Sequence, residues 1–141
     1  MEVEWLILAD SAQVVGAKLF LLGGGWDVLA VRKDFPFGQQ CAIALAVKVP
    51  WNETNQRHNF EVEILSEDQQ TEEPKSIAKM GGQFEVGRPP GIPIGQDQRI
   101  QLAINMGLNI DSPGIKTVVA RLGGIESKRI NFNVIAAKQG K

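Results

Sequence analysis

The sequence predicts an all-β fold, an antiparallel β-sandwich of about eight or nine strands. Two observations predict it. Apolar and polar residues alternate with a two-residue period along most of the 141-residue chain, and clusters of Gly, Pro, Asn and Asp separate these runs at short spacing. No segment has a convincing helical period, and the length fits one domain over residues 1–141. A small β-barrel is the alternative fold.

The longest alternating run lies between residues 99 and 110. From Ile100 to Ile110 every even position is apolar, whereas the odd positions are polar or small, which is typical of a strand with one face on a core. A shorter strand at residues 83–87 precedes it. The segment between them, residues 88–98, contains three prolines that lack an amide donor, so it can form neither a helix nor an interior strand. We therefore expect a stiff loop that projects from the end of a sheet.

Five more strands are expected in the first half of the chain, at residues 3–10, 18–22, 26–32, 41–49 and 59–65. In the first of them Val3 and Trp5 share one face, and Leu6 lies on the other. The three glycines at 23–25 predict a bulge or a sharp bend. In the fourth strand large apolar residues alternate with alanines, and this small face is suited to lie under another layer.

The second half continues the pattern after a polar segment. Residues 66–74, SEDQQTEEP, carry no apolar side chain and are expected to form a solvated loop. Residues 75–80 form either a helical turn or the start of the strand that reaches Phe84. A turn at 111–114 and strands at 115–122 and 128–136 complete the chain. One core between the sheets is expected to contain Ile43, Leu45, Phe60, Val62, Leu102, Ile104, Met106, Val118 and Phe132.

Charge and composition argue against several classes of partner. The chain has 15 Lys and Arg against 16 Asp and Glu, so its net charge of −1 gives no long-range attraction to nucleic acid or to an anionic membrane. The first ten residues, MEVEWLILAD, lack the basic start of a signal peptide, and no apolar run reaches the roughly 18 residues that cross a bilayer. The single cysteine, Cys41, is expected to be buried and inert. We expect a cytoplasmic protein.

Catalytic chemistry has few candidate residues. His58 is the single histidine, so a hydrolase or lyase would have to use it, with Glu53 or Asp97 as its carboxylate partner. One histidine and one cysteine cannot build an ordinary zinc site, and no cofactor or metal is expected. A carbohydrate-binding sandwich is the third hypothesis, with Trp26 and Trp51 as a stacking platform.

A contact surface for protein recognition is the function that the sequence favours. Its expected residues are Trp51, Arg88, Pro89, Pro90, Ile92 and Ile94. A loop stiffened by prolines loses little entropy on docking, and the two isoleucines would supply apolar contacts. The alternative is that Ile92 and Ile94 plug the end of their own sandwich. We expect a non-enzymatic interaction or assembly module whose partner is another protein or a second copy of the chain, as a homo-oligomer.

Three segments carry a resemblance to a known family. They are LGGGWD at 22–27, VPWNETNQRHNFEVEI at 49–64 and GQFEVGRPPGIPIGQDQRIQLAINM at 82–106. Together they resemble a family of small bacterial proteins known only as a domain of unknown function. The segment PGIKTVVARLGG at 113–124 also resembles the last hairpin of bacterial immunoglobulin-like sandwiches. The resemblance implies a single-domain bacterial protein, and it supplies no catalytic residues.

Overall fold

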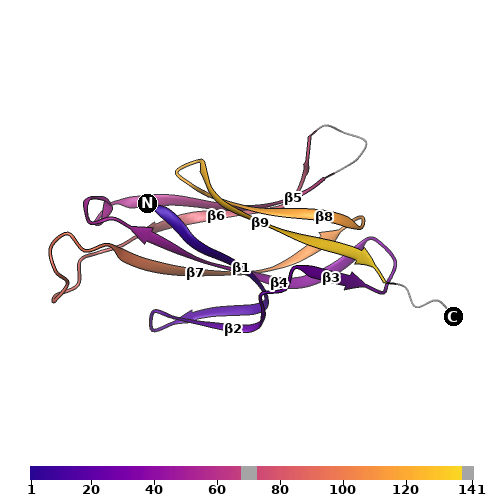
Figure 1. Ribbon diagram of the computed structural model, residues 1–141, viewed down its shortest axis with the longest axis horizontal. Helices are drawn as coiled ribbons and strands as arrows, with labels where there is room; N and C mark the ends of the chain where they lie inside the picture. The colour runs from indigo at the N-terminus through magenta and orange to yellow at the C-terminus, as the bar shows by residue number, and fades with distance from the viewer. Residues whose placement is uncertain (68–72, 138–141) are drawn as a thin grey trace.

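The computed structural model describes residues 1–67 and 73–137, which form two layers of β-strands (Figure 1). The first sheet has the strand order β2-β1-β4-β7, and its strands are β1 (Glu2–Val15), β2 (Lys18–Gly24), β4 (Phe37–Val49) and β7 (Gln98–Ile110). The second has the order β3-β9-β8-β5-β6, with β3 (Val28–Val31), β9 (Ile125–Ala136), β8 (Gly114–Leu122), β5 (Arg57–Ser66) and β6 (Lys75–Glu85). The prediction of a β-sandwich of about eight or nine strands is confirmed, with nine strands in the described residues.

The core lies between the two sheets, and β4 is central to the first of them. Ile43 pairs directly with Ile104 of β7, and both side chains are buried, as the alternation of the two strands predicts. All nine residues that we expected in the core belong to one apolar cluster. Within it Leu102 and Met106 are partly buried because β7 is an edge strand of its sheet. Phe60 is also partly buried and lies near the start of β5.

The first strand differs from the prediction at its start. The register between β1 and β4 shifts between Val3 and Trp5, which leaves Glu4 as an extra residue in β1. Such a bulge inverts the alternation, because two residues on one strand then oppose one on the other. Val3 therefore joins Leu6 in the main core, and Trp5 lies on the opposite face. The prediction that Val3 and Trp5 share a face is wrong for this reason.

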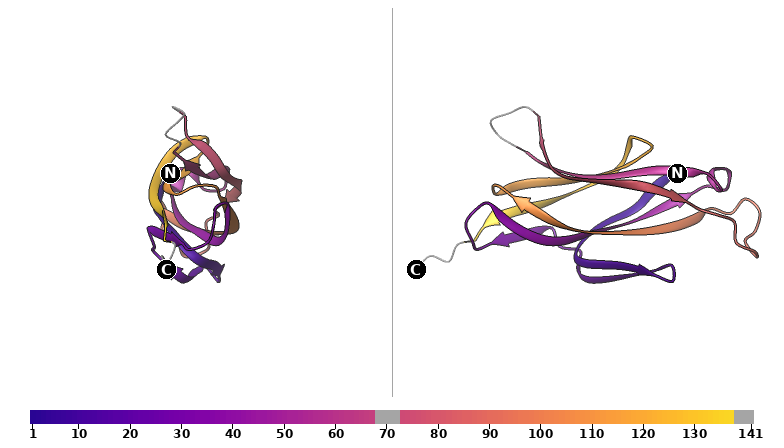
Figure 2. Two further views of the ribbon diagram at one scale, coloured as in Figure 1. Left: turned by 90° about the vertical axis from the view of Figure 1, so that its right-hand side faces the viewer. Right: turned by 180° about the vertical axis from the view of Figure 1, so that it is seen from behind.

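The alanine face of β4 is covered, as the sequence indicated. The hairpin of β1 and β2 bends across it and appears apart from the two main layers in both views of Figure 2. Leu19 and Leu21 of β2 pack on the fully buried Ala42 and Ala44. Small side chains on β4 let this third layer approach closely, so the first sheet is buried on both faces here.

Asn105 of β7 fastens this hairpin. Its Oδ1 accepts a hydrogen bond from the Ala12 amide at 3.1 Å, and its Nδ2 donates to the Ala12 carbonyl at 2.7 Å. Gln101, four residues earlier on the same face, donates to the carbonyl of Ala17 at 2.9 Å. The side-chain amide of Asn105 thus takes the role that a neighbouring strand would have for Ala12.

Three further segments refine the prediction. Residues 75–80 belong to strand β6, so the helical turn is excluded there. Ser66 is the last residue of β5 and is buried, not part of a solvated loop, while residues 68–72 of that predicted loop lie outside the described range. The pairing of β3 with β9 is parallel, an exception to the otherwise antiparallel sandwich. No helix in the described ranges has the length and apolar character needed to span a membrane.

Acidic residues on β5 are paired with cations across the second sheet. Arg121 lies opposite Glu61, and its Nη1 is 3.0 Å from carboxylate oxygens of both Glu61 and Glu63. The pKa of Glu61 is lowered first by its hydrogen bond from Lys79 and then by Arg121, and the pKa of Glu63 first by Ser76 and then by Arg121. Both carboxyls therefore bind fewer protons in the folded chain than in the unfolded chain.

This difference gives a testable pH dependence. A depressed folded pKa contributes stability that is present above the ordinary value of 4.5 and is lost as the pH falls through the lowered folded value. We expect the thermal midpoint to fall as the pH drops from 5 to 3, because both carboxyls then take up protons and lose their pairing with the cations. In Arg121→Met this fall should be smaller, because one shared cause of both shifts is gone. An identical pH profile for the two proteins in differential scanning calorimetry would contradict the pairing.

Candidate functional site

The loop that joins β6 to β7, residues 86–97, projects from one end of the sandwich, and we call it the tip loop (Figure 1). It contains two consecutive turns. The Ile92 amide donates to the Pro89 carbonyl at 3.3 Å, and the Gln96 amide donates to the Pro93 carbonyl at 3.2 Å. Gly91 and Gly95 stand third in these turns with φ of +94° and +87°, the conformation that a type II turn requires. Prolines and turns together make the loop stiff.

Arg88 anchors the base of the tip loop to the neighbouring 3₁₀ turn, Trp51–Glu53. Its guanidinium carbon lies 3.9 Å from the centre of the Trp51 ring, its Nε donates to Thr54 Oγ1 at 2.6 Å and its Nη2 donates to the Trp51 carbonyl at 2.8 Å. A planar cation stacked on an indole and held by two hydrogen bonds is a rigid contact. The structure thus brings Trp51 and Arg88 together, as supports of the loop.

The two isoleucines of the tip loop lie in different surroundings. Ile94 is second in the outer turn, and 90% of its surface is exposed. Ile92 is half-buried and lines a shallow depression with Lys48 and Asp97 among other residues. Pro89 and Pro90 are exposed. The interpretation as end plugs therefore does not describe Ile94, whereas Ile92 packs back toward the body of the sandwich.

His58 lies apart from the carboxylates that sequence reasoning assigned to it. Its Nε2 is 2.7 Å from the main-chain oxygen of Glu53. The Glu53 carboxylate lies 3.3 Å from the amino group of Met1, and the Asp97 carboxylate lies 3.5 Å from Lys48 Nζ. The histidine thus ties the 3₁₀ turn to β5, and the described residues hold no His58–carboxylate pair of the kind that general-base catalysis uses.

The two tryptophans proposed as a stacking platform are also separate. Trp26 is half-buried and packs edge-on against Phe132, with ring centres 5.6 Å apart. Its neighbour Gly25 bonds to Leu8, which pairs with Ile43, whereas Trp51 follows the end of β4. Val49, the end of β4, lies six residues after Ile43, which corresponds to about 20 Å of strand. A single ligand ring cannot contact both indoles across that distance.

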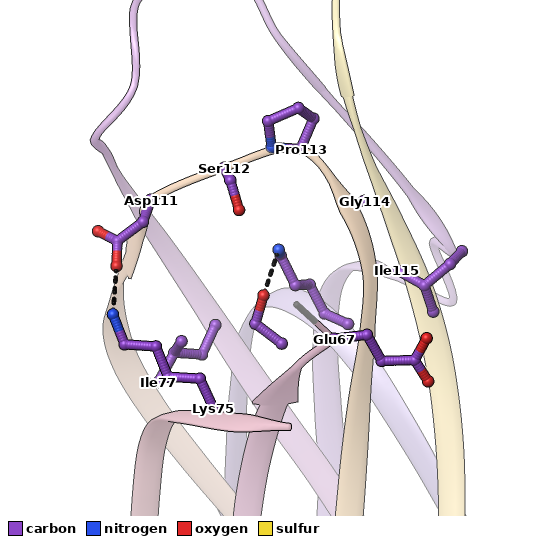
Figure 3. Close-up of a pocket in the computed structure, with 10 residues that line it drawn as sticks. Glu67, Lys75, Ile77, Asp111, Ser112, Pro113, Gly114 and Ile115 are labelled. Atoms are coloured by element: carbon purple, nitrogen blue, oxygen red, sulfur yellow. Dashed lines mark hydrogen bonds and ion pairs between the residues drawn. The ribbon is translucent and has the colours of Figure 1, made fainter. Parts of the chain in front are cut away.

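A pocket that sequence reasoning missed lies at the other end of β5 (Figure 3). It has a volume of about 710 Å³, and Ser66 and Lys116 line it together with the 111–114 turn. Lys116 is the largest of the fully buried side chains, and its Nζ donates to Ser66 Oγ at 2.7 Å. The alternation of inward and outward residues in β5 and β8 could have identified this pair. Ser66 comes two residues after the inward-facing Ile64, and Lys116 two residues before the inward-facing Val118, so both continue the core faces of their strands.

The sequence is similar to that of one protein family over most of its length. A protein-family model matches residues 4–135, nearly the whole of the described sandwich. The chain belongs to DUF6941. This is a family of unknown function, as the resemblance of the three segments indicated. DUF6941 therefore gives no catalytic or ligand-binding residue to carry over, and no curated protein matches the chain. Within the described ranges this DUF6941 member gathers no group of three or more His, Cys, Asp or Glu residues suited to a metal ion.

Proposed function

We propose that this DUF6941 member is a protein-interaction module that docks onto another protein through the tip loop, with Ile94 as the residue that enters the partner. The observation that supports this proposal is the 90% exposure of Ile94 at the apex of a stiff loop. Burying an isoleucine side chain contributes about 1.5–3 kcal/mol, and here only a partner can bury it.

The low entropy cost of docking supports the same proposal. The two turns and three prolines restrict the loop before any partner arrives, and Arg88 fixes its base on Trp51. A loop that is already ordered gives up little conformational freedom on binding, so more of the contact energy remains as affinity. In this proposal Ile94 makes the central contact, Pro89 and Pro90 flank it, and Trp51, Arg88 and Ile92 hold the loop in place.

The substitution Ile94→Asp tests the proposal. Because Ile94 is exposed, we expect a thermal midpoint within about 2 °C of the wild type. We expect the affinity for the partner to fall about tenfold or more, because a carboxylate would have to leave water to enter an apolar pocket. Immobilised wild-type and variant proteins exposed to the same cell extract, with bound proteins quantified by mass spectrometry, give the measurement.

Ile125→Asp is the matched control, since Ile125, the first residue of β9, is 74% exposed. It changes charge and hydrophobicity in the same way but at a position outside the tip loop. A partner that is lost from Ile94→Asp and kept by Ile125→Asp supports the proposal. Equal retention by both variants would refute it, and unfolding of Ile94→Asp would return Ile94 to a structural role.

Assembly with a second copy is the other candidate, and one observation favours it. Strand β2 is an edge of its sheet, and Phe20 and Leu22 on it are 56% and 71% exposed. An exposed apolar edge strand is a template for pairing with another strand. If two copies pair through β2, Leu22→Lys should convert a dimer to a monomer in sedimentation velocity. A wild-type protein that sediments as a monomer at high concentration would exclude this route.

We also propose the cytoplasm of a bacterium as the location, following the sequence prediction. Cys41 is compatible with a reducing compartment. It is buried, and burial raises the pKa of its thiol to about 11, so it stays protonated and unreactive at neutral pH.

A further inference from the structure

The Ser66–Lys116 pocket has no part in the proposed docking function, because it lies at the opposite end of the sandwich. Arg57, at the start of β5, pairs with Glu85, the last residue of β6 before the tip loop. Ser66 is the last residue of the same strand, nine residues further on, which corresponds to about 30 Å. The pocket and the tip loop are therefore independent surfaces.

The backbone places Ser66 and Lys116 together. They are direct cross-strand partners in the register of β5 and β8, and both are buried near this end of their strands. Two side chains on the same face of such a pair lie close enough to interact, which gives the 2.7 Å contact between Nζ and Oγ. Strand pairing, not a mobile loop, holds this geometry.

The exposed fractions of the two side chains suit Ser66 as a nucleophile and Lys116 as its base. Lys116 is 1% exposed, and Ser66 is 8% exposed and lines the pocket in front of it. Among the described residues, Ser66 is the hydrogen-bond partner of Lys116 Nζ, and the nearby Asp111 carboxylate forms an ion pair with Lys75 at 3.0 Å (Figure 3). The Lys116 ammonium is thus hydrogen-bonded to the neutral Ser66 hydroxyl inside the protein.

The surroundings of Lys116 favour its uncharged amine form. Burial lowers the pKa of Lys116, and the charge of Asp111 offsets that effect only in part. A larger fraction of Lys116 is therefore uncharged near neutral pH than for a lysine in water. In the uncharged form the 2.7 Å contact can run from the Ser66 hydroxyl to Nζ, and an amine that accepts this proton is a general base.

We propose that Ser66 and Lys116 form a serine–lysine dyad that hydrolyses small uncharged esters or thioesters. The size of the pocket suits a small ligand. Its walls combine apolar Ile77 and Pro113 with opposite charges that include Lys75 and Asp111, which favours an uncharged substrate over an anion or a cation.

The chemistry proceeds in two balanced halves. Ser66 Oγ bonds to the acyl carbon while its proton passes to Lys116 Nζ, and the new ammonium stabilises the oxyanion beside it. The bond to the alkoxide or thiolate then breaks, and that leaving group takes the proton from Lys116. A water molecule next attacks the acyl-serine and gives a proton to Nζ. Collapse releases the carboxylic acid and returns the proton to Ser66 Oγ.

An uncharged fluorophosphonate ester tests the dyad without knowledge of the substrate. Ser66 Oγ would bond to phosphorus, fluoride would leave, and intact-protein mass spectrometry would record one adduct that peptide mapping places on Ser66. Ser66→Ala should abolish it. Lys116→Met and Lys116→Arg should slow it about 100-fold or more, because neither can take the proton. The wild-type rate should rise with pH through the lowered pKa of Lys116, and the rate of Lys116→Met should lack that rise.

Ser112→Ala tests the alternative nucleophile. Ser112 lines the same pocket and points into it from the 111–114 turn, but it lies outside the strands and therefore has no cross-strand lysine partner (Figure 3). The adduct on Ser66 should still form in this variant, whereas an adduct carried by Ser112 would be lost. Circular dichroism melts of each variant separate loss of chemistry from loss of fold, and Ser66→Ala, which removes one oxygen, is expected to stay folded. No adduct on the folded wild type, an adduct on Ser112, or equal labelling of Lys116→Met would overturn the proposal.

Discussion

Replacing Ile104 by alanine is expected to lower the free energy of unfolding by about 2–5 kcal/mol. Ile104 is buried at the middle of β7 and lies directly opposite Ile43 of β4, which is fully buried. Removing its outer carbons leaves a cavity between two sheets whose backbones are fixed by strand pairing, so the site cannot collapse to fill it. Urea denaturation followed by circular dichroism measures the loss.

Ile94→Ala is the control for this effect, because it deletes the same atoms from an exposed position. We expect it to change the free energy of unfolding by less than about 0.5 kcal/mol. If Ile104→Ala were as mild as Ile94→Ala, the register of β7 against β4 and the position of the core would be wrong.

Replacing Asn105 by alanine is expected to lower the free energy of unfolding by about 1–3 kcal/mol and to loosen the β1–β2 hairpin. The change leaves both the amide and the carbonyl of Ala12 without the partners that the Asn105 side chain supplies. Unpaired main-chain groups then favour solvated conformations in which Leu19 and Leu21 leave the alanine face of β4. The consequence is local opening in addition to lower stability.

Native-state hydrogen exchange resolves this effect along the chain. Amides of β1 from residue 11 onward and of β2 should exchange faster in Asn105→Ala, whereas those of β8 should be unaffected. Gln101→Ala removes a single exposed hydrogen bond to Ala17 and should have a smaller effect in the same direction. Uniformly faster exchange over the whole chain would mean that Asn105 supports the sandwich as a unit and does not fasten the hairpin.

The alternation of apolar and polar residues was enough to predict most of the strands. Strands such as β4 and β7 have an unbroken two-residue period, so their inward faces could be predicted from the sequence. The bulge at Glu4 could not, because Val3, Trp5, Leu6 and Leu8 are all apolar and either alternation looks acceptable. The parallel pairing of β3 with β9 depends on contacts distant in sequence, which a local pattern does not contain.

The candidate sites were predicted less completely. Proline and glycine content identified the tip loop, because these residues restrict the backbone whatever surrounds them. The stacking of Arg88 on Trp51, 37 residues apart, depends on how β5, β6 and the 3₁₀ turn pack together. Lys116 and Ser66 were overlooked because lysine and serine are usually surface residues, although the period of their strands assigned both to the core face.

Photo-crosslinking from position 94 tests the docking claim most directly. A benzoylphenylalanine placed at Ile94 should form one covalent adduct in cell extract when irradiated, and excess wild-type protein should suppress that adduct while excess Ile94→Asp should not. The same group at Ile125, also exposed, should not form it. A single competed adduct specific to position 94 is the result we expect. No adduct, or the same adducts from both positions, would contradict the claim that the tip loop is the docking surface.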